Sequence, residues 1–265
     1  MPIQLVKPFG QDSVVLKHVN VYNNMKKHIF VILVLTGLLT TDTTQAQDFI
    51  FNPTLDPTAA IGYAAGEILK ADIAKKAGIS SSTGTNRPTA AASLTYKSTP
   101  ALRQQTVTTL AKRLQPNNSA GAKAVTDNFG PGKTDYGQQY QAMIKSMGLY
   151  DNNAADALTN YLITGYQIVN NLTGDHDIST AQNLGARAQV ATLLASKPSL
   201  KTPANCAQLG EQFKLQTVLL GSGWVGSVKA NTQVTYQKDV AAMFKRQYHM
   251  DMAQLKLTAQ GFAKK

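Results

Sequence analysis

A short loop at residues 175–177 carries three side chains that could bind a metal ion. Asp175, His176 and Asp177 are consecutive, and alternate residues of a loop can converge on a cation. Imidazole suits zinc, copper or nickel, but a metal site needs further ligands, and His249 is the one other histidine after residue 46. The alternative is a polar turn in which Asp177 helps to cap a helix that begins near Ser179. We expect the capped turn, with no bound metal or other cofactor.

A second group, His249 with Met250 and Met252, combines imidazole with soft thioether sulfurs. That combination suits Cu(I). Methionine also fills gaps in hydrophobic cores, and the nearby Met243 and Phe244 have the spacing of core residues. We favour the core interpretation and assign no metal ligand here.

Two carboxylates, Asp151 and Asp156, lie close together at a predicted helix start. A pair of carboxylates can hydrolyse a glycosidic bond if the right distance across a cleft separates them. Acidic residues are also favoured at a helix N-terminus by the helix dipole, without any catalysis. The glutamates after residue 46, Glu67 and Glu211, are not near an aromatic-rich segment. We predict no catalytic residue; the alternative is a hydrolase or metal-dependent enzyme that uses Asp151, Asp156 and residues 175–177.

Four tyrosines could line a binding groove: Tyr136, Tyr140, Tyr161 and Tyr166. A tyrosine ring offers a flat apolar face and a polar tip, which suits sugars and peptides. Tyrosines at helical spacing more often belong to a core, and both interpretations stay open here. The chain lacks a Gly-rich phosphate loop, a Gly-x-Ser-x-Gly elbow, a His-Glu-x-x-His motif and a Cys-x-x-Cys motif.

Helices are the elements that must position these residues. Cap residues, prolines at helix starts and apolar residues at helical period predict an all-α fold, a single compact bundle of about six helices. The expected helices after residue 94 cover 100–115, a short Ala-rich stretch before Gly130, 136–147, 154–172, 180–197, a segment from 203 and a segment from 232. We find no alternating strand pattern of useful length.

The connection between 136–147 and 154–172 is short, so these two helices are predicted to be antiparallel neighbours whose apolar faces meet. Leu158, Tyr161 and Leu162 should then lie at the centre of the core. Cys206 shares a stripe with Leu209 and Phe213, and we expect it to be buried and chemically quiet.

The N-terminal 93 residues are predicted to precede the folded domain. Met25 is followed by a basic start, an apolar run over 29–39 and small residues up to Ala46, which together indicate a secretory signal peptide. Residues 1–24 are predicted to come from a start codon assigned too far upstream. A signal peptide at 25–46, cleaved after Ala46, is followed by a helix and a low-complexity linker at 47–93. A helical domain is predicted at 94–265. This organisation predicts a periplasmic or secreted protein.

Composition narrows the class of partner. The chain has 265 residues, 26 basic and 15 acidic, with a formal net charge of +11 at pH 7. One cysteine cannot form an internal disulfide. The basic residues are scattered, and runs such as Lys245-Arg246 fall short of the five to eight that form a nucleic-acid or membrane patch. We therefore expect an unknown protein or an anionic envelope polymer as partner, no specific nucleic acid, and no transmembrane anchor after signal cleavage.

Three short motifs carry a resemblance to a known family. They are Leu94-Thr95-Tyr96 with Pro100–Arg103, Gly148-Leu149 with Asn153–Ala157, and the closing Leu257–Phe262. With the signal peptide and linker, the chain resembles an uncharacterised family of exported bacterial proteins, a domain of unknown function. The resemblance implies an all-helical periplasmic or secreted domain over about 94–262 and carries no known activity. Gln260 departs from the family pattern, which has an acidic residue before the final Gly-Phe. From the residues and the resemblance, we predict a non-enzymatic binding or interaction module.

Overall fold

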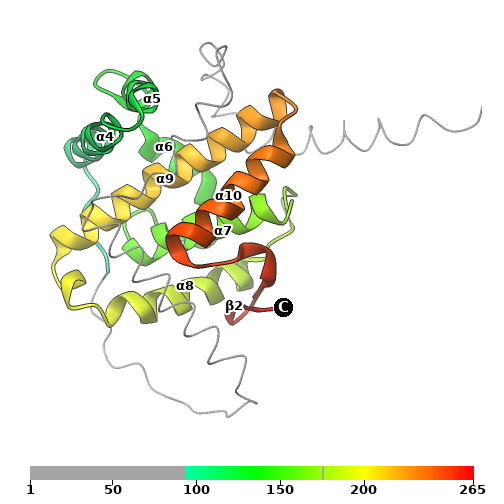
Figure 1. Cartoon of the computed structure of the whole chain (residues 1–265). Helices are drawn as coiled ribbons and strands as arrows, with labels where there is room; N and C mark the ends of the chain where they lie inside the picture. The colour runs from blue at the N-terminus through cyan, green and yellow to red at the C-terminus, as the bar shows by residue number, and fades with distance from the viewer. Residues whose placement is uncertain (1–93, 175) are drawn as a thin grey trace, which may run out of the picture.

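The computed structural model describes residues 94–174 and 176–265 (Figure 1). Its α-helices are α4 (Pro100–Leu114), α5 (Ser119–Phe129), α6 (Tyr136–Ile144), α7 (Ala154–Val169), α8 (Thr180–Ala195), α9 (Pro203–Lys229) and α10 (Gln233–Tyr248). Two 3-10 turns, η2 (Pro198–Leu200) and η3 (Met252–Gln254), and two strands, β1 (Leu255–Thr258) and β2 (Gly261–Lys264), complete this part. The all-α class is confirmed. The predicted signal peptide at 25–46 and the predicted helix and linker at 47–93 lie outside the described residues.

The predicted caps start the helices at the expected positions. Thr99 accepts a hydrogen bond from the backbone N–H of Leu102, and Asn153 accepts two from the first turn of α7. Ser179 and Gln182 form a capping box at the start of α8, in which each side chain bonds the other residue's backbone. These side chains satisfy N–H groups that a helix start leaves without a partner, which is why the helix starts could be predicted locally.

α9 is the axis of the fold and continues for 27 residues through its four glycines (Figure 1). Gly223 allows a close helix contact instead of a bend, because a Cβ placed there would lie 2.3 Å from Oη of Tyr236 on α10. Of the helices in residues 94–174 and 176–265, none has the combination of length and apolar character needed to cross a membrane.

The predicted antiparallel pairing of α6 and α7 is wrong. Buried residues of α7, including Leu158, Tyr161 and Leu162, belong to the main hydrophobic cluster with α8, α9 and α10. Buried residues of α6 belong to a second cluster with α4 and α5. Both helices pack against α9, which contributes to the two clusters. α6 and α7 touch where Oη of Tyr140 lies 3.5 Å from the Asp156 carbonyl, but their apolar residues belong to different clusters and do not form one shared face.

The C-terminal tail forms a two-stranded hairpin that the sequence pattern did not predict. Leu257 pairs with Phe262 across it. Two glutamines of α8 bond its backbone: Gln182 donates to the Leu257 carbonyl at 2.7 Å, and Gln189 both accepts from Phe262 N at 2.8 Å and donates to its carbonyl at 3.2 Å. An isolated two-stranded hairpin is marginal in water, so α8 is what stabilises this one.

Candidate functional site

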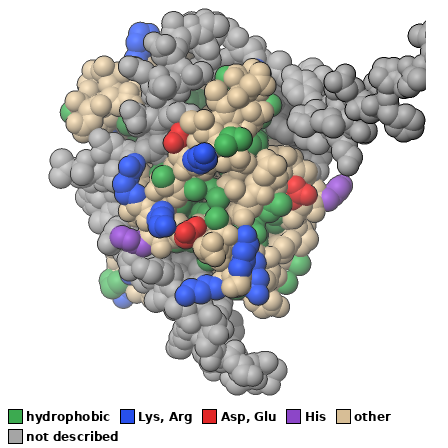
Figure 2. Space-filling view, turned by 45° about the vertical axis from the view of Figure 1, so that its right-hand side comes forward, with side chains coloured by type: hydrophobic (Ala, Val, Ile, Leu, Met, Phe, Trp, Pro, Cys, Tyr) green, Lys and Arg blue, Asp and Glu red, His purple; other side chains and the backbone are tan. Residues whose placement is uncertain are grey.

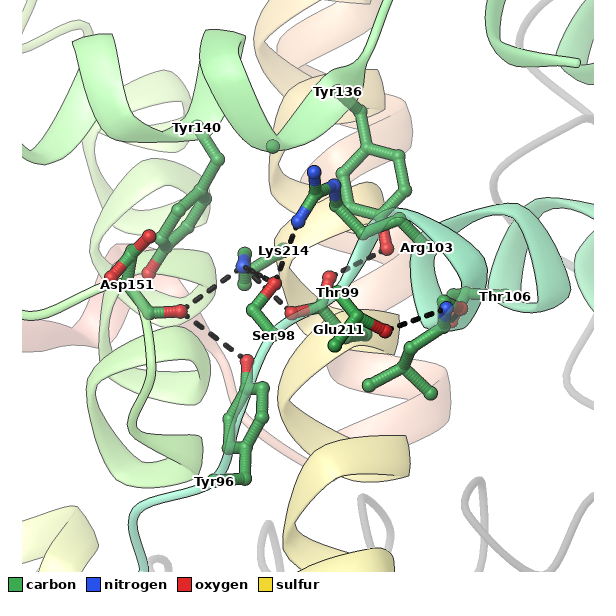
Figure 3. A network of polar contacts seen from close by, with 12 residues as sticks. Tyr96, Ser98, Thr99, Arg103, Thr106, Tyr136, Tyr140, Asp151, Glu211 and Lys214 are labelled. Carbon is green, nitrogen blue, oxygen red and sulfur yellow. Dashed lines mark hydrogen bonds and ion pairs between the residues drawn. The ribbon is translucent and has the colours of Figure 1, made fainter. Parts of the chain in front are cut away.

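A buried ion pair on α9 is the centre of a polar network around which several helices meet. Glu211 and Lys214 are 0% and 1% exposed, and Oε1 of Glu211 lies 2.7 Å from Nζ of Lys214. Tyr136 on α6 donates its hydroxyl hydrogen to the second carboxylate oxygen of Glu211 at 2.7 Å. Nζ of Lys214 also donates to the Asp151 carbonyl at 3.0 Å and to Oγ of Ser98 at 3.4 Å (Figure 3). The pair thus connects α9 to α6, to the segment before α4 and to the loop before α7.

Aromatic rings enclose the ammonium group. Nζ of Lys214 lies 5.5 Å from the ring centroid of Tyr140 and 6.0 Å from that of Tyr96, within the range of cation–π attraction. Burial raises the pKa of Tyr96, Tyr136 and Tyr140, and the nearby charge of Glu211 raises it further for Tyr96 and Tyr136. These phenols therefore remain neutral and act as hydrogen-bond donors.

A second ion pair extends the network toward the surface. Arg103 and Asp135 form a two-bonded pair, with Nε–Oδ1 and Nη2–Oδ2 distances of 2.7 and 2.6 Å, and their side chains are 17% and 31% exposed. Nη1 of Arg103 donates to Oγ of Ser98 at 2.9 Å, so Ser98 joins this pair to Lys214. Burial alone would raise the pKa of Asp135, but the hydrogen bonds from Arg103 and from Gly137 N hold it below its ordinary value.

We expect Asp135→Asn to remove one acid-sensitive contribution to stability. The folded-state pKa of Asp135 lies below its ordinary value of 3.8, so the contribution is present above that pH and is lost as the pH falls through the folded pKa. Wild-type stability should therefore decline more steeply than that of Asp135→Asn between about pH 4 and about pH 2. Urea unfolding at a series of pH values measures both slopes, and equal slopes would contradict the assignment.

The network is built to hold helices together. Both oxygens of Glu211 accept hydrogen bonds, and the ammonium group of Lys214 contacts a carboxylate, a carbonyl and a hydroxyl. The three acceptors around the ammonium group of Lys214 all belong to the network, so its N–H groups are used within the protein. Sequence reasoning missed this site because Glu211 and Lys214 are ordinary surface residue types; their spacing of three on an otherwise apolar stripe was the available signal.

The carboxylates proposed for an enzyme do not share a pocket. Asp156 is fully buried and bonds Nε of Arg187 and the Tyr150 backbone N–H, while Asp151 bonds the side chain of Gln141. Burial raises the pKa of Asp156, and its hydrogen bonds and the charge of Arg187 oppose that rise. The described part of the chain therefore gives no support to the convergence on which the hydrolase alternative depends.

The metal-binding candidates are also separate. Asp177 is exposed and accepts a hydrogen bond from Gly174 N at 2.6 Å, so it closes its own loop without capping α8. His176 is exposed, and Asp175 lies outside the described residues. His249 is the left-handed residue that ends α10, with φ of 50°. Across 94–174 and 176–265, no three side chains of His, Cys, Asp or Glu are grouped so as to hold a metal ion.

The tyrosines proposed to line a groove are core residues. Tyr136, Tyr140 and Tyr161 are at most 1% exposed, and Tyr166 is 8% exposed. Tyr161 packs against the rings of Phe213 and Phe244, with centroids 5.3 Å apart in each case. The groove interpretation is therefore wrong for these residues, because their apolar rings fill the space between helices.

A hollow that the sequence did not predict lies between α4 and α9. Its volume is about 330 Å³, and we call it the α4–α9 groove. Its lining residues are Leu102, Gln105, Thr106, Thr109, Leu110, Arg113, Ala204, Asn205, Ala207, Gln208, Gln212 and Leu215. The lining contains one cation and no carboxylate. Within the described part of the chain, the side chains of Gln105, Thr109, Gln208 and Gln212 have no hydrogen-bond partner. They are available to a ligand.

Comparisons of the chain with protein-family models, with curated proteins and with solved structures found no match.

Cys206 has the predicted position in the core. It is 0% exposed, its Sγ donates to the Leu200 carbonyl at 3.2 Å, and burial raises the pKa of its thiol. The thiolate is the reactive form, so we expect a thiol reagent to label the native protein slowly and the urea-unfolded protein rapidly. Rapid labelling of the native protein, or a disulfide-linked dimer on a non-reducing gel, would contradict this.

Proposed function

We propose that the protein is an exported, non-enzymatic binding module that acts in the periplasm or outside the cell. The observation that carries the proposal is the α4–α9 groove. Its volume of about 330 Å³ is at the lower end of the range for ligand sites, about 300–1,000 Å³. Polar side chains without an internal partner lie in it beside apolar ones, which is the usual composition of a binding site.

The chemistry of the groove favours an uncharged or acidic polar polymer, and we propose an anionic envelope glycan as the ligand class. The amides of Gln105, Gln208 and Gln212 both donate and accept, as sugar hydroxyls do. Arg113 places a positive charge in the lining, and the lining contains no acidic residue to repel a carboxylate. The net charge of +11 attracts polyanions, and basic side chains lie at separate places on the face in Figure 2.

Binding to polygalacturonate, an acidic glycan, with dextran as the neutral comparison, tests this proposal. We expect the acidic glycan to bind more tightly, and the double variant Gln105→Ala/Gln208→Ala to weaken binding by about tenfold, the effect of losing two hydrogen bonds. Gln138→Ala on α6 is the matched control, because Gln138 is exposed like the other two and is not a lining residue. If the wild type, the double variant and Gln138→Ala bound the acidic glycan equally, the groove would not be the binding site. If neither glycan bound, an anionic glycan would not be the ligand.

Export is tested separately. We expect protein recovered from expressing bacterial cells to begin at Gln47, as measured by N-terminal sequencing, because the signal-peptide pattern ends at Ala46. A mature N-terminus at Met1 or Met25 would contradict cleavage.

A further inference from the structure

The hairpin and the end of α10 bring five exposed basic side chains to one part of the surface. They are Lys245, Arg246, Lys256, Lys264 and Lys265. In the sequence they form three short groups and no continuous basic run. Asp251 is the one acidic residue among residues 240–265, so the side chains of this segment carry a formal net charge of +4 at pH 7. We call the five basic residues the C-terminal basic surface.

A chain of contacts joins the end of α10 to the last residue of the hairpin. Nζ of Lys245 lies 3.5 Å from Oδ2 of Asp251. The Asp251 carbonyl accepts a hydrogen bond from Gln254 N at 3.0 Å, and the Gln254 carbonyl accepts one from Lys265 N at 3.0 Å. This last bond extends the pairing of β1 with β2 by one residue. Lys256 and Lys265 therefore lie on the same outward side of the hairpin, because side chains alternate along a strand and the leucines of β1 are buried on the other side.

The rest of the domain holds this surface in position. Nζ of Lys265 donates to the Ala253 carbonyl at 2.7 Å and to Oδ1 of Asn170, the residue that ends α7, at 3.2 Å. Both acceptors are uncharged, so these contacts position the ammonium group and do not neutralise its charge. Gln182 and Gln189 of α8 bond the hairpin backbone, and α8 itself has no acidic residue.

We propose that the C-terminal basic surface binds the anionic headgroups of a lipid bilayer. Clusters of about four to eight basic residues are typical of proteins that bind anionic lipid surfaces. Four of the five residues here are lysines, whose ammonium groups are compact point charges and do not form two-bonded pairs with one fixed group. Lipid headgroups move in the plane of the bilayer, so they can match the spacing of such charges.

This surface is less suited to a nucleic acid or to a glycan. Single-stranded nucleic acids stack on exposed aromatic rings, and the aromatic residues of segment 240–265 are all buried. A glycan site is usually concave, and none of the five basic residues lines the α4–α9 groove. The exposed hairpin turn carries Ala259 and Gln260, with no large apolar side chain to enter the bilayer. The contact should therefore be electrostatic, reversible and sensitive to salt.

Co-sedimentation with vesicles, using the protein recovered from expressing cells, tests the proposal. One set of vesicles contains equal amounts of phosphatidylglycerol and phosphatidylcholine, and the other contains phosphatidylcholine alone. We expect binding to the anionic vesicles to be at least about tenfold tighter, and to weaken by at least about tenfold when NaCl is raised from about 0.05 M to about 0.5 M. The double variant Lys256→Gln/Lys264→Gln should weaken it by about thirtyfold, because each basic residue near an anionic surface contributes about fivefold.

Lys112→Gln/Lys133→Gln is the matched control. It removes the same number of charges, and both side chains are exposed. Lys112 is on α4 and Lys133 follows α5, and Figure 1 shows these two helices far from the hairpin. The control should weaken vesicle binding by less than about threefold. Equal losses in the two double variants would mean that net charge alone matters, and this result would overturn the proposal. Equal binding of the wild type to both kinds of vesicle, or no loss in Lys256→Gln/Lys264→Gln, would overturn it as well.

The same variants separate this surface from the α4–α9 groove. Lys256→Gln/Lys264→Gln should bind polygalacturonate within about threefold of the wild type, because neither lysine lines the groove. Loss of polygalacturonate binding with unchanged vesicle binding would assign the surface to an acidic glycan and overturn the bilayer proposal. The vesicle measurement does not depend on the groove, so the two proposals fail separately.

Discussion

Glu211→Ala should destabilise the protein by about 3–5 kcal/mol, because it leaves the charge of Lys214 buried without its counter-ion. Lys214 is 1% exposed, and its remaining contacts are a carbonyl, a hydroxyl and two aromatic rings. None of these carries a full negative charge. Tyr136 would also lose the acceptor of its hydroxyl. Chemical denaturation at pH 7 measures the loss.

An exposed ion pair supplies the control. Lys123 and Asp127 on α5 approach to 2.5 Å, but their side chains are 75% and 49% exposed. Solvent screens such pairs, so Asp127→Ala should cost less than about 1 kcal/mol. If Glu211→Ala cost no more than Asp127→Ala, the buried pair would have no role in holding the helices together.

A double replacement separates the ion pair from the space that it fills. Glu211→Leu with Lys214→Met should cost less than the sum of the two single changes, because it removes both charges at once and keeps much of the volume. Additive losses would show that the two side chains stabilise the protein independently.

Leu162→Ala is the second change with a large expected effect. Leu162 is 2% exposed on α7, in the main hydrophobic cluster, and 14 of the 16 residues of α7 are buried. Truncating a buried leucine costs about 2–5 kcal/mol of a total of about 5–15. For a chain of this size the melting temperature should fall by about 4–20 °C, as measured by calorimetry.

His176→Ala should change the melting temperature little, because His176 is exposed on a turn. The reverse order, with a tolerant Leu162 and a fragile His176, would mean that the loop around His176 is a structural or metal-binding site. Adding a zinc chelator to the wild-type protein would then lower its melting temperature as well.

The sequence by itself determined the helices and most of their starts. Thr99-Pro100, Asn153, Ser179 and Thr202-Pro203 each precede a helix, and each side chain bonds backbone groups two or three residues further on. Such contacts are local, so a pattern of a few residues suffices to predict them. The burial of Leu158, Tyr161, Leu162 and Cys206 was predicted as well, since apolar periodicity marks the inner side of a helix.

Only the tertiary structure decided which helices meet and what lies between them. Both α6 and α7 pack against α9, and the length of the connection between α6 and α7 does not predict this, because several apolar helix faces compete for the same partner. The burial of Glu211 with Lys214 needs Tyr136, Ser98 and the Asp151 carbonyl, which are 63 or more residues away in sequence. The α4–α9 groove likewise joins residues about a hundred positions apart. Contacts of this kind are selected by the total free energy of packing, so local sequence patterns did not predict them.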